Sequence, residues 1–272
     1  MKTKPTIAVL VLVYCIILSG LIFAQNTTRI PIHPVSDSTR FDSIIHRIKT
    51  TENALYVFDI DNTLLITNNN EFGSDWWFEQ TTQKPDLKLH VTDSCLFNVL
   101  TPLFYSIFNT RAVFSGQAEA LNSLKKKNSR TLALTSRGYT PVIAEATELE
   151  LTKNQFHFLQ KDSVMMNDQV VLLNGVIYTA GKNKGTALMN YVQNHPEYRK
   201  IYYFDDSENK VVDVQKAFNG SGKDITLYHL TIAAKIPFTE KEIRYMKTKL
   251  CNLIESINNI GKTTCKCNNQ TR

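Results

Sequence analysis

The sequence has no strong excess of charge of either sign, and this limits the kinds of partner it can have. Lys and Arg number 31 against 25 Asp and Glu among 272 residues, a formal net charge of +6. The one dense basic run, Lys125–Lys127 with Arg130, stands where we expect a helix to end, and cations there favour the helix dipole. We therefore expect a solvated helix terminus and no nucleic-acid-binding surface.

The chain also lacks internal repeats and the biased composition of disordered segments. Hydrophobic residues make up 43% of it and charged residues 21%, which is typical of an ordinary globular protein. A chain of this length fits one sizeable α/β domain, with room for a small insert.

One long apolar run stands at the start of the chain. Lys2 and Lys4 precede an apolar stretch from Ile7 to Phe23, which is followed by Ala24 and polar residues. This order is typical of a secretory signal over residues 1–24, cleaved after Ala24. The stretch is nearly long enough to span a bilayer, so an uncleaved anchor is the alternative and would be the chain's one contact with a membrane. Both readings predict an exported protein, periplasmic or secreted.

Beyond that segment cysteine is scarce, and only Cys95, Cys251, Cys265 and Cys267 remain. An even set in an exported protein permits disulfides but does not fix their pairing. Neighbours as close as Cys265 and Cys267 rarely pair with each other, so we expect Cys251 to pair with one of them. A zinc site is not expected, because no histidine clusters with these cysteines.

Buried strands and amphipathic helices are predicted to alternate along the body of the chain. The strands are expected at 54–58, 131–134, 201–204 and 225–228, and the helices at about 42–51, 117–127, 141–151, 184–193 and 209–218. Such alternation predicts an α/β fold with a doubly wound parallel sheet. Ligands of such sheets bind beyond the carboxyl ends of the strands.

Other segments depart from this alternation. Asn174-Gly175 between the apolar runs 170–173 and 176–178 predicts a tight hairpin. Residues 75–113 are too long for a loop and rich in aromatics, which favours a small, mostly helical insert. Apolar residues from Ile243 to Ile257 indicate a late amphipathic helix. We expect a linker over 25–40, the main domain over 41–260 and a flexible tail over 261–272.

Two aspartates directly after the first strong strand are the leading candidates for chemistry. Phosphoryl transfer needs a nucleophile, a proton donor for the leaving oxygen and positive charge around the phosphate. Asp59 could attack phosphorus and form an aspartyl-phosphate. Asp61 could protonate the leaving alkoxide and then deprotonate the hydrolytic water. The alternative is that Asp59 and Asp61 have no catalytic role and instead form a turn or cap a helix.

A magnesium ion is expected between these carboxylates and the phosphate, because two anions would otherwise repel each other. Mg²⁺ prefers oxygen ligands, which suits Asp59, the backbone carbonyl of Asp61 and an aspartate of the Asp205-Asp206 pair. That pair again follows an apolar strand.

Two further side chains could hold the phosphate. The hydroxyl of Thr135 and the amides after it can donate to phosphate oxygens. Lys184, at a helix start, could neutralise the nucleophile and the phosphate, with Lys182 as its rival. Arg137 could contact substrate or lie at the surface. The lone histidines His90, His157 and His229 are expected to be structural.

These residues, in this order, resemble the haloacid dehalogenase (HAD) superfamily from about Leu55 to Ala217. The segment Val57-Phe58-Asp59-Ile60-Asp61-Asn62-Thr63-Leu64 looks like its first motif, Leu134-Thr135-Ser136-Arg137 its second, Lys184 its third and Phe204-Asp205-Asp206-Ser207 its fourth. The chain is most similar to exported bacterial HAD proteins without assigned function, and more distantly to class B and class C acid phosphatases.

The resemblance implies a Rossmann-like core with a cap inserted after the first motif. It favours Asp206 as the metal ligand and Asp205 as its support, and an acid at Asp61 argues against the dehalogenase branch. We expect a Mg²⁺-dependent phosphatase that hydrolyses phosphomonoesters of small molecules. The alternative is a secreted binding or host-interaction protein with vestigial catalysis. Trp76 and Trp77 would line a cap pocket or form the core of the cap.

Overall fold

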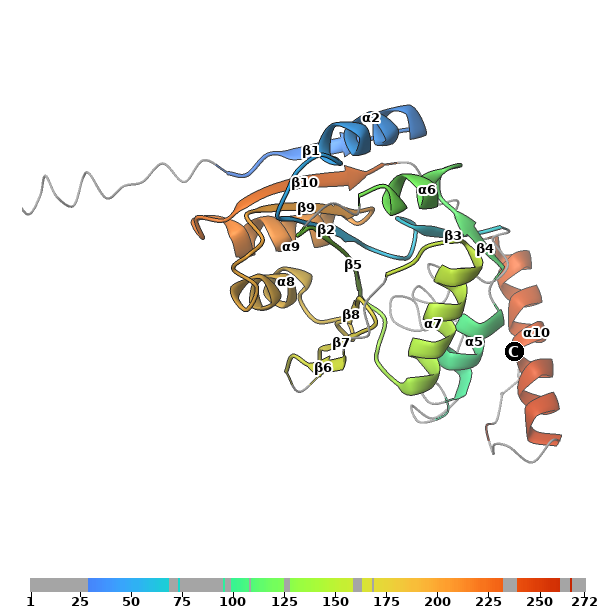
Figure 1. The fold of residues 1–272 in the computed structure, drawn as a ribbon. Helices are drawn as coiled ribbons and strands as arrows, with labels where there is room; N and C mark the ends of the chain where they lie inside the picture. Colours follow the sequence, from blue (N-terminus) through green and yellow to red (C-terminus); the bar gives the residue numbers. More distant parts are fainter. Residues whose placement is uncertain are drawn as a thin grey trace, which may run out of the picture.

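A mostly parallel sheet organises the computed structural model of the chain (Figure 1). The structure describes residues 29–68, 73, 95, 99–107, 109–124, 128–158, 163–167, 169–231, 239–259 and 265. The expected leader, Trp76, Trp77, His90, Cys267 and most of the expected tail lie outside these residues.

The sheet has eight strands in the order β1-β10-β9-β2-β5-β8-β7-β6. Its strands are β1 (Ile32–Val35), β2 (Ala54–Phe58), β5 (Arg130–Thr135), β6 (Ser163–Met165), β7 (Val171–Leu173), β8 (Val176–Tyr178), β9 (Lys200–Asp205) and β10 (Asp224–Leu230). Along this order every pairing from β1 to β8 is parallel, and the pairings of β8 with β7 and of β7 with β6 are antiparallel. The predicted α/β class with a largely parallel sheet is confirmed.

Helices cover both faces of this sheet (Figure 1). They are α2 (Ser38–Ile48), α6 (Gln117–Asn122), α7 (Pro141–Lys153), α8 (Lys184–Gln193) and α9 (Glu208–Phe218). Strand β2 contributes side chains to the cores on both faces of the sheet. Tyr56 and Phe58 pack into a core with α2 and α6, whereas Leu55 and Val57 pack into a second core with α8 and α9. Alternate residues of a strand point to opposite faces, so a continuous apolar run fits a strand that is buried on both sides.

The start of the domain differs from the prediction. Ile32–Val35, expected in a linker, form β1 and pair in parallel with β10. α2 also begins at Ser38, earlier than expected, because the carboxylate of Asp37 caps it by accepting from the Arg40 N–H at 2.8 Å. α6 ends earlier than expected, at Asn122.

The hairpin is confirmed. β7 and β8 pair antiparallel around Asn174 and Gly175, which have φ angles of 50° and 79°. Both residues lie in the left-handed region that a tight primed turn requires.

The described part of the expected insert includes a helix and a strand that the structure places beside the sheet. Strand β4 (Thr110–Ala112) pairs antiparallel with β3 (Leu65–Thr67), and α5 (Thr101–Ile107) precedes it. Phe104 of α5 packs with Ile143 of α7 and with Met246 of α10 (Glu240–Asn259), the predicted late helix. α5, α7 and α10 therefore form a separate apolar cluster beside the sheet (Figure 1).

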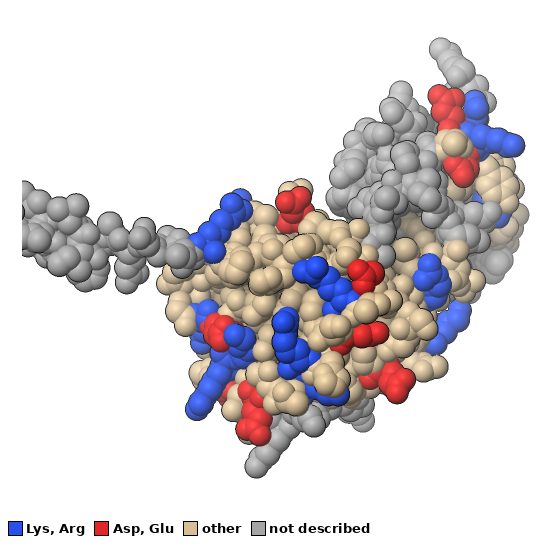
Figure 2. Space-filling view, turned by 90° about the horizontal axis from the view of Figure 1, so that it is seen from above, with Lys and Arg blue, Asp and Glu red and all other residues tan. Residues whose placement is uncertain are grey.

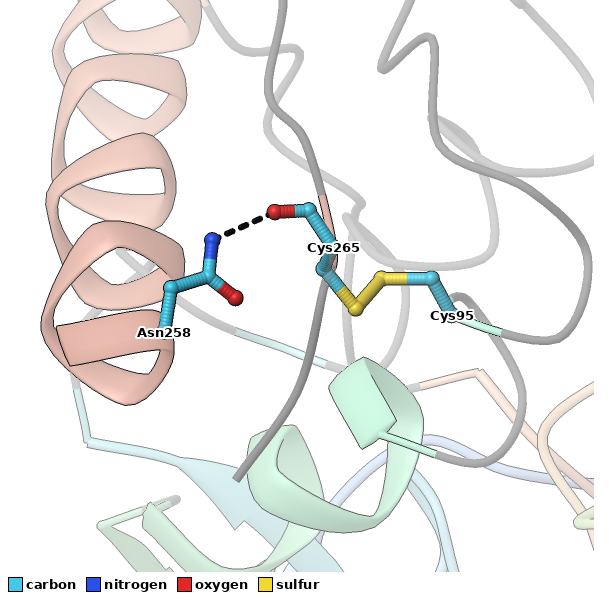
Figure 3. Close-up of a disulfide and its surroundings, with 3 residues drawn as sticks. All are labelled: Cys95, Asn258 and Cys265. Atoms are coloured by element: carbon cyan, nitrogen blue, oxygen red, sulfur yellow. Dashed lines mark hydrogen bonds between the residues drawn. A yellow bond between two sulfur atoms is a disulfide. The ribbon is translucent and has the colours of Figure 1, made fainter. Parts of the chain in front are cut away.

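A disulfide ties this cluster together. Cys95 bonds to Cys265 with their Cα atoms 5.7 Å apart, and Asn258 of α10 donates to the Cys265 carbonyl (Figure 3). Of the two partners expected for Cys251, Cys265 is therefore excluded, and pairing with Cys267 stays a prediction. Cys251 is itself disulfide-bonded and fully buried. Within the described ranges, no helix is both long and apolar enough to cross a membrane.

The close approach of α8 to α9 depends on Gly185, the residue after Lys184. A Cβ atom at this position would lie 2.3 Å from the Asp213 carbonyl oxygen and 2.9 Å from the Ala217 Cβ, both on α9. A backbone oxygen cannot swing aside as a flexible side chain can. The glycine therefore sets how closely α8 packs, and with it where Lys184 begins the helix.

We predict that Gly185→Ala destabilises the protein although alanine is the better helix former. The propensity gain of about 1 kcal/mol is outweighed by an overpacking cost of about 1–3 kcal/mol. Urea unfolding would measure the free energy of unfolding, with the exposed Gln193→Ala of the same helix as control, expected to change it by less than about 0.5 kcal/mol. A more stable Gly185→Ala variant would show that the two helices can move apart freely.

Candidate functional site

The central parallel strands bring the predicted acids to one edge of the sheet. The Asp59 N–H donates to the Phe204 carbonyl at 2.9 Å, which extends the ladder between β2 and β9 by one step. Asp59 and Asp205 therefore end neighbouring strands side by side. Asp59 is 6% exposed and Asp205 is fully buried.

Asp61 and Asn62 lie in the turn that follows β2. Asn62 takes a left-handed φ of 60°, which asparagine tolerates better than most residues. The Ile60 carbonyl accepts from the Leu64 and Leu65 N–H groups, each at 2.9 Å. Gln117 of α6 donates to the Thr63 carbonyl at 2.8 Å and ties the turn to the body of the domain.

Lys184 joins the two strand ends. Its Nζ lies 2.6 Å from Asp59 Oδ1 and 2.7 Å from Asp205 Oδ2, and the residue is 1% exposed. The Asn183 side chain caps α8 by accepting from the Thr186 N–H, so Lys184 is the first residue of the helix. Lys182 is exposed and makes no such contact in the described structure, so of the two predicted lysines Lys184 is the one at the site.

Burial and neighbouring charges shift the pKa values of both Asp59 and Lys184. Desolvation is the largest influence on Asp59, and with the nearby charges of Asp205, Asp206 and Asp61 it outweighs Lys184 and raises the Asp59 pKa well above its usual value. Burial alone would lower the Lys184 pKa, but Asp205 and Asp59 raise it overall. The site thus holds a charged lysine beside a carboxyl group that needs more positive charge to stay ionised.

The two adjacent aspartates have different surroundings. Asp205 Oδ2 accepts from Lys184 and from the Tyr203 hydroxyl, and its Oδ1 accepts from the Ser207 N–H at 2.8 Å. Asp206 is partly exposed, and one carboxylate oxygen from each of Asp59, Asp205 and Asp206 falls within 4.8 Å of the others. This donor set of oxygens could hold a hard divalent cation. Both Asp205 oxygens already accept hydrogen bonds within the protein, and the assignment of Asp206 as the direct ligand stays a prediction.

Thr135 ends β5, beside β2. It is fully buried, and its hydroxyl oxygen accepts from the Arg137 N–H at 3.1 Å. The Thr135 carbonyl accepts from the Thr179 N–H at 3.0 Å. The hydroxyl hydrogen can still donate to a ligand, so the predicted contact of Thr135 with phosphate stays a prediction.

Arg137 is not at the surface. It is 4% exposed, and its Nε and Nη2 donate to the two Asp61 carboxylate oxygens at 3.0 and 2.8 Å. Its Nη1 donates to Glu150 at 2.6 Å and to Thr147 at 2.9 Å, both on α7. Burial alone would lower the pKa of Arg137, but the charges of Asp61 and Glu150 raise it well above its usual value. The guanidinium is therefore firmly charged.

Tyr203 and Glu150 were missed by the sequence analysis, for different reasons. Tyr203 precedes Asp205 by two residues in one strand and so shares its face, a signal that strand alternation carries. Glu150 lies on the buried side of α7, and nothing local distinguishes it from the exposed Glu145 and Glu148. Only the fold shows that it meets Arg137.

Family comparison agrees with the extent of this domain. The model of the family described as "Protein of unknown function (DUF2608)" matches residues 37–260. The chain belongs to the DUF2608 family. No curated protein and no solved structure matches it. The match runs from the N-cap of α2 to just past the end of α10, so the family includes the cluster of α5, α7 and α10 as well as the sheet.

We predict that a divalent cation stabilises the protein through Asp206. A cation at one hundred times its Kd contributes about 2.7 kcal/mol to the free energy of unfolding, and Asp206→Asn should remove most of this gain. Melting curves with Mg²⁺ or with chelator would measure it. Asp224→Asn removes an exposed acid at the opposite end of the sheet, paired with Lys200 at 2.6 Å, and should respond like the wild type. Equal stabilisation of Asp206→Asn and wild type would exclude Asp206 as a ligand.

Proposed function

We propose that this DUF2608 protein is a Mg²⁺-dependent phosphatase of the HAD type that hydrolyses phosphomonoesters of small molecules. The observation that carries the proposal is the contact of Lys184 with both Asp59 and Asp205 at the end of β2 and β9. A lysine between two strand-end carboxylates supplies the positive charge that a nucleophile and a phosphate both need.

The side chains around Asp59 suit a two-step reaction. Asp59 forms a bond to phosphorus, the bond to the leaving oxygen breaks, and Asp61 gives that oxygen a proton. Water then attacks the aspartyl-phosphate, Asp61 takes the water proton, and phosphate leaves with Asp59 restored. Lys184 stays hydrogen-bonded to Asp59 and offsets negative charge on the phosphoryl group during both steps.

The charge balance supports a cation at this site. Among the residues that the structure describes at this site, five carboxylates, those of Asp59, Asp61, Glu150, Asp205 and Asp206, lie near two cations, Lys184 and Arg137. A dianionic phosphate would be repelled by this surplus of negative charge. Bound Mg²⁺ would supply Lewis-acid charge neutralisation, with Asp59, Asp206 and the Asp61 carbonyl as the residues to hold it.

Export remains part of the proposal. A buried structural disulfide such as Cys95–Cys265 forms and persists in oxidising compartments and is rare in the cytosol. This supports a periplasmic or secreted enzyme. The mixed distribution of acidic and basic side chains on the face shown in Figure 2 accords with a small soluble substrate.

We predict that the purified protein hydrolyses an aryl phosphate such as p-nitrophenyl phosphate with Mg²⁺ and not with excess chelator. Ca²⁺ should inhibit, because its larger and looser oxygen shell misplaces Asp59 relative to phosphorus. Release of nitrophenolate measures both effects. An inactive protein would favour the alternative, a binding protein that has kept the fold without the chemistry, and equal activity in chelator would remove the metal from the mechanism.

We predict that Asp59→Asn leaves the fold intact and lowers turnover by about a thousandfold or more, because an amide does not attack phosphorus. The asparagine carbonyl can still accept a hydrogen bond from Lys184. A melting curve would show that the protein folds, and the phosphatase assay would show the loss. Retention of more than about a tenth of wild-type turnover would exclude Asp59 as the nucleophile.

A further inference from the structure

We propose that the edge of the sheet opposite the candidate site is a membrane-facing surface that binds the anionic headgroups of a bilayer. The inference goes beyond the proposed phosphatase activity and does not depend on it. The predicted leader was the one membrane contact expected from the sequence, and the folded domain adds a second. We call this surface the amino edge, because the parallel strands begin there.

The amino edge consists of the segments that lead into the parallel strands, which are residues 29–31, 46–53, 128–130, 193–200 and 216–224. Strand register places the starts of β10, β9 and β2 in one row, because Lys200 pairs with both Asp224 and Ala54. β5 begins next to β2, with Arg130 opposite Leu55. β1 runs parallel to β10 and begins at the same edge, at the left of Figure 1. Segments far apart in the sequence therefore form one end of the domain.

Basic side chains outnumber acidic ones at the amino edge. These segments carry eight cations and three acids. The cations are Arg29, Arg47, Lys49, Arg130, Arg199, Lys200, Lys216 and Lys223, and the acids are Glu52, Glu197 and Asp224. The opposite edge holds the carboxylates of the candidate site, so charge is separated along the direction of the strands.

Helix stability explains only some of these cations. Cations in the last turn of a helix favour its dipole, and this accounts for Arg47 and Lys216. Arg29, Arg199 and Lys223 lie outside the helices, and none of these three forms an ion pair within the described part of the chain. Their charge is therefore available to a partner.

The start of the described chain is fixed to the amino edge. Gln215 of α9 is 3% exposed, and its side chain accepts from Arg29 Nε at 2.7 Å and donates to the Ile30 carbonyl at 2.5 Å. The Asn219 side chain accepts from the Ile30 N–H at 3.4 Å. The chain that follows the predicted leader therefore lies against the basic end of α9.

This attachment limits how far the amino edge can be from a membrane. Five residues separate Phe23, the last of the apolar stretch, from Arg29. A fully extended chain of that length spans at most about 20 Å. The headgroup layer on one side of a bilayer is roughly 5–8 Å deep, so a leader held in the membrane keeps the amino edge close to the headgroups. When the leader is cut after Ala24, the basic surface retains the protein at the same membrane.

Charge and position together make an anionic bilayer the partner that this surface fits. Each Lys or Arg close to such a bilayer raises the affinity by about fivefold, and the attraction fades within roughly 8–10 Å. A nucleic acid carries charge of the same sign, but the leader places a lipid surface at this edge. The candidate site, at the other end of the strands, then faces away from the bilayer.

The first experiment measures which lysines a membrane covers. The full chain is expressed and purified in the form that the cell leaves it, then mixed with vesicles of phosphatidylcholine or of an equal mixture with phosphatidylglycerol. Acetylation by a water-soluble reagent, read by mass spectrometry, reports the accessibility of each lysine. We expect the anionic vesicles alone to slow acetylation of Lys216 and Lys223. Lys182, which is exposed at the start of α8 on the opposite edge, should react at an unchanged rate.

The second experiment separates the position of the charge from its sum. The variant Arg199→Gln/Lys216→Gln removes two exposed cations from the amino edge, and the matched control Arg40→Gln/Lys182→Gln removes two exposed cations elsewhere. The measured quantity is the ratio of the affinities for anionic and neutral vesicles, in which any contribution of the leader cancels. Melting curves show that each variant folds.

We expect the amino-edge variant to lower this ratio by about 20- to 30-fold, the effect of two cations near an anionic surface, and the control by less than about threefold. Equal losses in the two variants would overturn the inference, because only net charge would matter, and so would equal affinity of the wild type for both kinds of vesicle. Equal or stronger protection of the same lysines by a DNA duplex would overturn it in favour of a nucleic-acid surface. None of these results bears on the phosphatase assay, so the proposed function is tested separately.

Discussion

The contact of Lys184 with Asp59 and Asp205 is the interaction on which the site depends. A buried lysine is costly unless its charge is matched, and a buried pair that loses one partner costs about 3–5 kcal/mol. The lysine can reach both acids only because β2 and β9 are neighbours and α8 begins directly at the edge of the sheet. Strand order, the cap at Asn183 and the glycine that lets α8 approach α9 therefore all serve this one contact.

A second group of charged residues lies around Asp61. Arg137 and Glu150 link Asp61 to α7, and the ring of Tyr105 links Arg137 to α5. The segment between the first two motif-bearing strands is thus more than an appendage to the sheet. It shares an apolar cluster with the late helix α10, and the disulfide between Cys95 and Cys265 joins the two. Sequence segments that lie far apart meet beside the same carboxylate.

The sequence analysis predicted the residues around Lys184 well, because the signals that mark them are local. Asp59, Asp61 and Asp205 each follow an apolar strand, and parallel strands end at one edge, so their meeting could be expected from order alone. The pairing of Asp61 with Arg137 could not, because it depends on how the turn at Asn62 and the start of α7 face each other. β1 was missed because a four-residue strand containing Pro34 resembles a linker, and the residues of β10 with which it pairs lie 195 positions later. Disulfide pairing was open for the same reason, since cysteine spacing does not encode distance in space.

The position of β1 has a consequence for how the chain acquires its structure. β1 is the earliest strand described, yet its hydrogen-bonding partner is β10, the latest strand of the sheet. β1 therefore cannot complete its pairing with β10 until residue 230 has been synthesised, and Cys95 cannot form its disulfide before Cys265 has been synthesised. Contacts of such long sequence separation slow folding, because the intervening chain must be ordered before they form. The nascent chain thus stays incompletely folded until both β10 and Cys265 have been synthesised.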